Sequence, residues 1–297
     1  MLRDWIPEPR NELRYYKPSP NARVGFRWRR SCPGHIFAAF SEMVASHYVL
    51  LGVVLFLASV LHSAAGFAFA LLAIPVLLIG GFQPQAVIAI TAVSVVVHGC
   101  LSIVRSSEKP DWKGLSWLIA IGAAMQPIGN CILSQILFLS RGQICQIFGC
   151  ILLAVVILRL TLRPEPREHL PPVWGVITMI ASGIISGMSG MGGPPIVFWL
   201  IAHKWSNDRM RVTMWAIFSS MAVTNLCWMS ARFGEPVWNA IVLGLLFTPV
   251  TLLGTLPGSR IGAKMSPVTM RNVATTILVV VAVYAILQPM VLPRTGR

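Results

Sequence analysis

The sequence contains few charged residues. Of its 297 residues, 11% are charged and 55% are hydrophobic, and the mean hydropathy is +0.71. Globular domains usually carry about 25% charged residues, so this composition argues against a soluble protein. The apolar residues gather in long blocks, and a bilayer core of about 30 Å is crossed by about 20 apolar residues in a helix. The sequence therefore predicts an all-α integral membrane protein with many spans.

Acidic residues are especially scarce. There are ten Asp and Glu residues in total, and none lies well inside an apolar block. Cation and proton transporters usually keep a carboxylate within the bilayer, where its cost is tolerated for function. A cation permease stays open as an alternative, but the missing carboxylates disfavour it.

The six cysteines form no CxxC motif, and none has a nearby His at metal-ligand spacing. Five of them lie in apolar blocks, where a free thiol behaves as a small hydrophobic group. We therefore expect no disulfide framework, no metal site and no cofactor.

Positive charge is distributed unevenly. The net charge is +14, and eight of the 24 Lys and Arg residues lie within the first thirty positions. Most of the others occupy short connectors between apolar blocks, where positive charge orients membrane proteins. The expected partner of this charge is the lipid bilayer and not a nucleic acid.

The composition changes along the chain and divides it into five parts. We predict a basic, largely disordered arm (1–46), a first membrane repeat (47–161), a polar linker (162–172), a second membrane repeat (173–290) and a short tail (291–297). Each repeat contains five apolar blocks. The blocks at 67–80 and 193–203 are too short to span alone, which predicts broken or re-entrant helices.

The two halves resemble each other at an offset near 125 residues, which places Gly129 on Gly254 and Ser134 on Ser259. Basic connectors follow the third and fifth segments of the first half but the second and fourth segments of the second half. This alternation predicts a helical bundle of two inverted repeats. Pro127 and Pro249 lie midway along the fourth segments and predict hinges or kinks.

A run rich in glycine ends the first segment of the second half, and the run closes with Gly192-Gly193-Pro194-Pro195. Proline breaks a helix interior but suits the first turn, so a new helix is expected to begin at Pro194 or Pro195 within the membrane. The free N–H groups and the positive dipole end of such a helix can hold an anion without a charged side chain.

Residues around this break and at the equivalent positions of the first half make up the predicted substrate site. Its polar members in the third segments could instead bond their own backbone, and the glycines could simply allow close helix packing. The histidines at 62 and 98 are expected to be buried and neutral rather than proton carriers. The predicted substrate-binding residues are Ser63, Gly66, Thr91, Ser94, Ser186, Ser189, Gly190, Gly192, Gly193, Pro194, Ser219 and Asn225.

An enzyme remains a second hypothesis. Gly187-Met188-Ser189-Gly190 fits the GxSG motif of rhomboid-type intramembrane serine proteases, with Ser189 as the nucleophile. Such a serine needs a histidine on a later helix, and His203 is the only histidine that follows it. His203 lies at the far end of the next short block, so we expect no enzyme.

The glycine motifs resemble the TauE/SafE family of membrane permeases, often called sulfite exporters. The resemblance covers roughly residues 47–290 and is closest over 186–194, whereas Ser63-Ala64-Ala65-Gly66 departs from the glycine run usual in the first half. The resemblance implies a permease for a small anion, namely sulfite, an organosulfonate or a related organic anion. We expect a multi-pass protein of a bacterial inner (plasma) membrane, and a homo-oligomer stays open.

Overall fold

The protein is built from helices. The computed structural model describes all residues except 1–32, 66–68, 162–166, 169, 265–266 and 292–297. The described part contains no β-strand beyond one isolated bridge. The helices are α1 (Pro33–Ala65), α2 (Phe69–Ile79), α3 (Pro84–Arg105), α4 (Trp112–Ile136), α5 (Arg141–Thr161), α6 (Pro172–Ser189), α7 (Gly193–Ile201), α8 (Asn207–Phe233), α9 (Glu235–Leu246), α10 (Thr248–Lys264) and α11 (Pro267–Val291).

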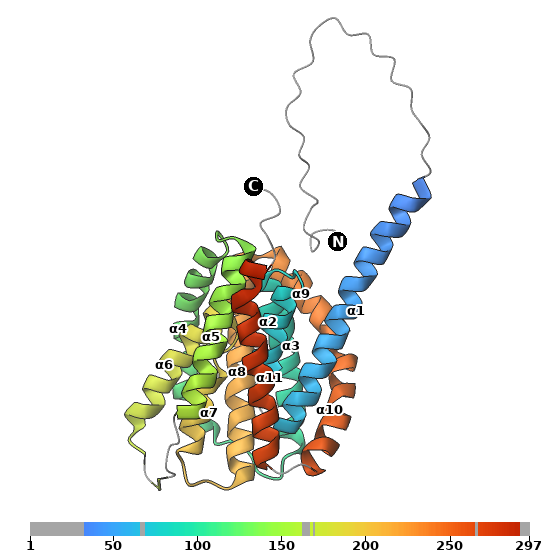
Figure 1. Ribbon diagram of the computed structural model, residues 1–297. Coiled ribbons are helices and arrows are strands. Elements are labelled where there is room, and N and C mark those ends of the chain that lie inside the picture. Colours follow the sequence, from blue (N-terminus) through green and yellow to red (C-terminus); the bar gives the residue numbers. More distant parts are fainter. Residues whose placement is uncertain (1–32, 66–68, 162–166, 169, 265–266, 292–297) are drawn as a thin grey trace, which may run out of the picture.

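The helices form one bundle, with the start of α1 projecting beyond it (Figure 1). Within the described residues, six helices are long and apolar enough to cross a membrane, or seven if the bent pair α9 and α10 counts as one span. Side chains such as Val104, Phe138 and Leu246 are exposed on the bundle surface, where lipid would solvate them. These features confirm the predicted all-α, multi-spanning membrane protein.

Two pairs of consecutive helices turn back on themselves. His203, just after α7, forms a parallel bridge with Arg167, just before α6. In this bridge the Arg167 N–H donates to the Ala202 carbonyl over 2.9 Å, and the Lys204 N–H donates to the Arg167 carbonyl over 3.1 Å. The pair α6 and α7 therefore enters and leaves at one end of the bundle. The short block predicted at 193–203 is a re-entrant helix of nine residues.

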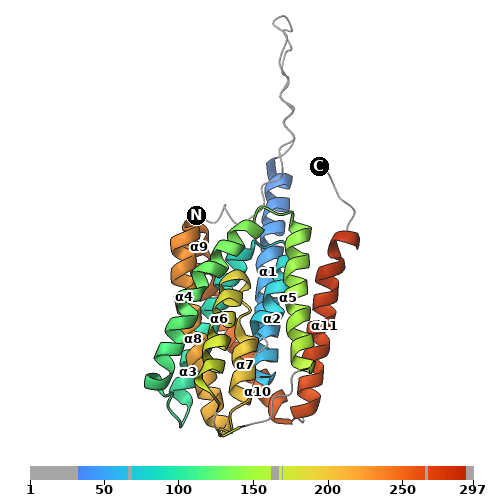
Figure 2. The ribbon, with the colours of Figure 1, turned by 90° about the vertical axis from the view of Figure 1, so that its left-hand side faces the viewer.

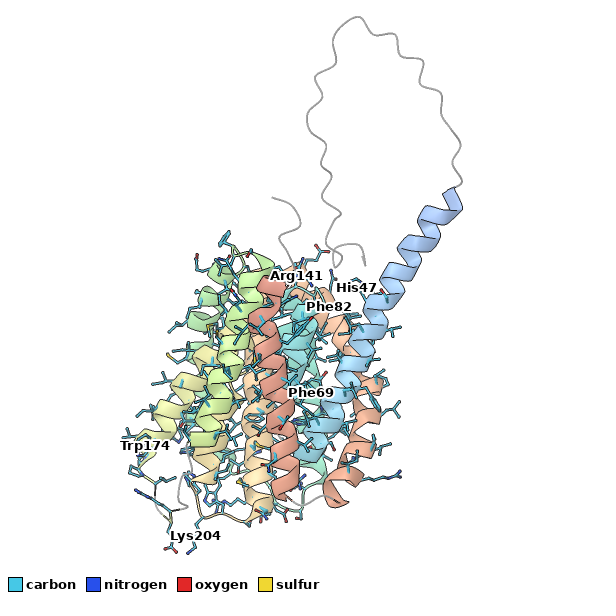
Figure 3. All side chains as sticks on the ribbon, in the orientation of Figure 1. His47, Phe69, Phe82, Arg141, Trp174 and Lys204 are labelled. Atoms are coloured by element: carbon cyan, nitrogen blue, oxygen red, sulfur yellow. The ribbon has the colours of Figure 1, made fainter. Side chains whose placement is uncertain are left out.

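The first pair behaves in the same way at the other end of the bundle. The ring of His47, near the middle of α1, lies 5.8 Å from the ring of Phe82, which follows α2. Figure 3 labels both residues near Arg141, at the end opposite Lys204. Helix α2 thus runs back beside α1.

Packing relates the two halves of the chain. Helix α4 packs along α6 and α10 along α1, while α3 packs along α8 and α5 along α11. The last of these contacts is visible in both views of the bundle (Figures 1 and 2). Let α1, α2, α3, α4 and α5 of the first half correspond in order to α6, α7, α8, α9–α10 and α11 of the second. Under this correspondence the contact of α4 with α6 is equivalent to that of α10 with α1, and the other two contacts each join equivalent helices. The pattern agrees with an internal repeat, and its inverted sense stays a prediction.

The two mid-helix prolines behave differently. Helices α9 and α10 are bent by 49° where Pro249 opens α10, so this position is a kink. Pro127 leaves α4 continuous. Because Pro127 has no N–H, the Ala123 carbonyl loses its helical partner, and Trp228 Nε1 on α8 donates to that carbonyl over 3.1 Å. A neighbouring helix thus replaces the missing bond.

The predicted arm, linker and tail are only partly covered by the described residues. The predicted arm reached residue 46, and α1 already begins at Pro33. Residues 1–32, much of the linker and the tail from 292 onward lie outside the described residues. The division into two membrane repeats stays a prediction.

Candidate functional site

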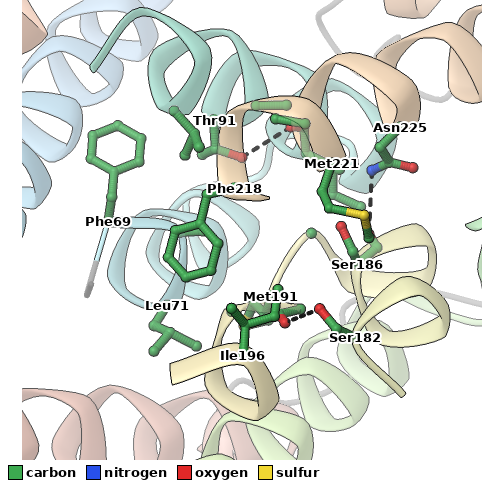
Figure 4. Close-up of a pocket in the computed structure, with 18 of the residues that line it drawn as sticks. Phe69, Leu71, Thr91, Ser182, Ser186, Met191, Ile196, Phe218, Met221 and Asn225 are labelled. Carbon is green, nitrogen blue, oxygen red and sulfur yellow. Dashed lines mark hydrogen bonds between the residues drawn. The ribbon is translucent and has the colours of Figure 1, made fainter. Parts of the chain in front are cut away.

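A cavity of about 80 Å³ lies beside the break between α6 and α7 (Figure 4). Its walls come from α1, α2, α3, α6, α7 and α8, so segments from both halves of the chain meet there. The predicted site residues that line it are Thr91, Ser186, Gly190, Gly192, Gly193, Pro194 and Asn225.

Glycine makes the turn at the break possible. Gly190 ends α6 with a φ of 71°, in the left-handed region that residues with a Cβ rarely adopt, and its N–H donates to the Ser186 carbonyl over 2.8 Å. The Met191 N–H then donates to Ser189 Oγ over 3.3 Å. The chain therefore reverses within three residues before α7 begins at Gly193.

The start of α7 leaves two backbone donors free. The first four N–H positions of a helix have no partner within it. At α7 these positions are 192–195, and Pro194 and Pro195 have no N–H. Among the described residues no acceptor takes up the N–H of Gly192 or Gly193, and both glycines line the cavity.

Side chains satisfy the carbonyl groups around the break. Ser182 Oγ donates to the Gly192 carbonyl, and Asn225 Nδ2 donates to the Ser186 carbonyl over 3.3 Å. Asn225 Oδ1 in turn accepts from Asn130 Nδ2 on α4 over 3.2 Å. Because these contacts tie α6, α7, α8 and α4 together, the free N–H groups are held on a rigid support.

Apart from the imidazole of His62, the side chains that line the cavity are uncharged. Its walls carry no Asp, Glu, Lys or Arg, and its apolar surface includes Phe69, Ile88, Phe218 and Met221. The described acidic residues lie in exposed or half-buried positions outside it. Within the described chain, no three His, Cys, Asp or Glu side chains gather into a possible metal site. The cavity can therefore offer hydrogen bonds and a helix dipole to a ligand, but no formal charge.

Several predicted site residues do not line this cavity. Ser63 Oγ donates to the Thr255 carbonyl over 3.0 Å, and Ser94 Oγ donates to the Ile90 carbonyl over 3.2 Å. Ser189 Oγ donates to the Ile185 carbonyl over 2.9 Å, and Ser219 is buried against Gly99. Gly66 lies outside the described residues. Ligand binding by these four serines stays a prediction, and three of them donate to backbone carbonyls, the arrangement that the alternative interpretation describes.

The glycines fall into two groups. A Cβ at Gly183 or Gly187 would collide with backbone carbonyls of α4, at Gly122 and Gln126 respectively. Those two glycines serve close packing of α6 on α4, as the packing alternative predicted. At Gly193 a Cβ would meet only the Phe218 ring, 3.3 Å away.

Sequence reasoning missed two polar residues that support the site from α4. Gln126 Nε2 donates to the Met221 carbonyl over 2.7 Å, and Asn130 holds Asn225. Both amides are buried. Their i, i+4 spacing places them on one face of a helix, which is the signal that could have identified them.

The geometry does not bring Ser189 and His203 together as a catalytic pair. Ser189 is fully buried, and nine residues of α7, about 13 Å of helix, separate its turn from His203. His203 packs between Trp199 and Trp205, and its Nδ1 lies 2.8 Å from the Trp199 carbonyl oxygen. Burial lowers the pKa of this imidazole. His203 is therefore too far from Ser189 to accept a proton from its hydroxyl, as a catalytic base must.

Apolar spanning helices around a cavity at a helix break are the construction of a membrane transporter. The family model described as Sulfite exporter TauE/SafE matches residues 51–285. The chain belongs to the TauE/SafE family, and it is a membrane transporter.

One curated relative supports this assignment. It is 23% identical over 205 residues, which cover 67% of this chain and 78% of the relative, and it is described as "Probable sulfite/organosulfonate exporter TauE" from Cupriavidus necator. No solved structure matches the chain.

Proposed function

We propose that the protein is a permease for a small anion, which binds in the cavity at the start of α7. The observation that carries this proposal is the pair of free N–H groups at Gly192 and Gly193, which face no competing acceptor among the described residues. Sulfite, an organosulfonate or a related organic anion is the proposed substrate, and a bacterial inner membrane is the proposed location. The wording of the curated relative's name supports both substrate classes.

The dipole of α7 provides the attraction. An aligned helix carries the equivalent of about half a positive charge at its N-terminus, and this favours an anion in a site without water. The Ser186 hydroxyl and the Asn225 amide lie on the same walls. Since none of these groups carries a full charge, the anion is held weakly enough to leave, which transport requires.

The size of the cavity favours a compact anion. A cavity of about 150 Å³ in another protein binds benzene, and this one measures about 80 Å³. Sulfite, with four heavy atoms, is suited to such a volume. An organosulfonate could place its sulfonate head at α7 only if its tail extended past the apolar residues of the wall. Sulfite is therefore the preferred substrate.

A cation is a poorer candidate for the same cavity. Cation sites in membranes use carboxylates or rings of carbonyl oxygens. The walls contain no carboxylate, and two nearby carbonyls, at Gly192 and Ser186, already accept side-chain hydrogen bonds. The positive end of α7 would also oppose a cation.

Flux measurements in proteoliposomes test the proposal. Purified protein is reconstituted, and uptake and efflux of sulfite, sulfate, taurine, sulfoacetate, acetate and sodium are compared with those of protein-free vesicles. The expected result is saturable sulfite flux, inhibited by other small sulfur oxyanions. Saturable sodium flux without anion flux would contradict the proposal.

A further inference from the structure

A buried histidine from the first half of the chain lies in the wall of the same cavity. His62 is in the last turn of α1, is 5% exposed and lines the cavity. It comes from the first half of the chain, whereas Gly192 and Gly193 come from the second.

Three aromatic side chains fix the orientation of the His62 ring. Its centroid lies 4.8 Å from the Trp215 ring and 6.0 Å from the Phe69 ring, both in edge contacts. The His98 ring stacks on it at 5.9 Å, with an interplanar angle of 23°. The imidazole therefore has little freedom to turn toward another partner.

A backbone hydrogen bond assigns the position of the His62 proton. The N–H of Phe69, the first residue of α2, donates to His62 Nδ1 over 3.3 Å. An Nδ1 that accepts carries no proton, so a neutral ring has its proton on Nε2. The bond also joins the end of α1 to the start of α2 across the undescribed residues 66–68.

The donor on the other side of the ring has no partner. His62 Nε2 is buried, and it makes no hydrogen bond within the described part of the chain. Leaving a buried donor without a partner is energetically costly, so an unpartnered buried donor calls for an explanation such as a bound ligand. A ligand in the cavity that this ring lines would supply the missing acceptor.

We propose that His62 is a substrate-binding residue that donates its Nε2–H to the anion in the cavity. The ligand class is a compact oxyanion, because its several acceptor oxygens can take the N–H groups of α7 and the imidazole N–H together. The inference rests on the proposed anion transport. It adds that both re-entrant pairs bind the anion, α6–α7 through its backbone and α1–α2 through a neutral side-chain donor.

Two amide substitutions separate the two sides of the ring. His62→Asn places an acceptor near the Nδ1 position and removes the Nε2 donor, whereas His62→Gln can place a donor near Nε2. His98→Asn is the matched control, because His98 is equally buried in the same aromatic cluster but does not line the cavity. Saturable flux of ³⁵S-sulfite in proteoliposomes gives KM and the maximal rate, and thermal unfolding in detergent monitors the fold.

The KM for sulfite should rise about tenfold to a hundredfold in His62→Asn, because the variant loses one hydrogen bond to a charged ligand. His62→Gln should have a lower KM than His62→Asn because it can restore a donor, and His98→Asn should stay within about threefold of the wild type because it loses no bond to the anion. Equal KM in His62→Asn and wild type would overturn the inference while leaving the proposed function intact. Equal loss in both His62 variants, or in His98→Asn, would also overturn it, since packing would then explain the effect. Absence of saturable anion flux in the wild type would overturn the proposed function and this inference together.

Discussion

Ser206 Oγ donates a hydrogen bond to Glu108 Oε1 over 3.0 Å. Glu108 lies in the connector between α3 and α4, and Ser206 is the N-cap of α8, so the bond joins one connector from each half of the chain. These connectors contain Lys109 and Lys204 and therefore gather positive charge at one end of the bundle. At the other end, Arg141 Nη2 donates to the Ile79 carbonyl over 2.8 Å.

The first prediction concerns sidedness. Single cysteines at Glu108 and Asp208, in a background without the six native cysteines, should react with a membrane-impermeant maleimide from the same side. A cysteine at Ser140, beside Arg141, should react from the opposite side only. Positive charge retained in the cytoplasm would make the first side cytoplasmic. Labelling of positions 108 and 208 from opposite sides would refute this arrangement.

The second prediction tests the cavity. Gly193→Leu should reduce sulfite flux at least tenfold, because its side chain would block approach of an anion to the start of α7. Gly52→Leu is a matched control, since a Cβ at Gly52 also meets mainly a Phe ring, that of Phe247 at 3.2 Å, but lies away from the cavity. Expression and insertion of both variants are measured by fluorescence size-exclusion chromatography. Full activity of Gly193→Leu would remove the site assignment.

The third prediction separates packing glycines from site glycines. Gly187→Ala should destabilise the protein by about 1–3 kcal/mol, because the added methyl group would overpack the contact between α6 and α4. Gly193→Ala should cost less, since the ring of Phe218 can shift. Thermal unfolding in detergent compares the two variants. A melting temperature for Gly187→Ala equal to that of the wild type would contradict the packing role.

The fourth prediction concerns the proline in α4. Trp228→Phe should destabilise the protein by about 1 kcal/mol, because the Ala123 carbonyl then loses its donor. In a Pro127→Ala background the restored N–H can satisfy that carbonyl, so the same Trp228 change should cost less. A double-mutant cycle of unfolding free energies measures the difference. Equal costs in the two backgrounds would show that the two sites are independent.

The fifth prediction concerns Ser189. Ser189→Ala should reduce transport only in part, because its Oγ supports the turn through Met191 and does not line the cavity. A fluorophosphonate probe should leave Ser189 of the wild type unlabelled, with a known serine hydrolase as the positive control. Stoichiometric labelling of Ser189 would restore the protease hypothesis.

The membrane class followed from the sequence because it depends on composition along the chain. Long apolar blocks without acidic residues require helices in lipid, and no tertiary contact alters that requirement. The position of the α6–α7 break was equally local. Gly190 and the prolines at 194 and 195 determine backbone conformation by themselves, so their effect could be predicted residue by residue.

Which polar side chains surround the cavity was decided only by tertiary structure. Ser94 and Thr91 lie one turn apart on α3, and both bond to carbonyls of their own helix, yet only Thr91 lines the cavity. The difference arises from the direction in which α3 faces α7 and α8. Likewise, Pro127 leaves its helix unbroken because Trp228, far away in the sequence, reaches the freed carbonyl. Hydrogen bonds within one turn follow from the sequence, whereas contacts between distant helices depend on how the bundle packs.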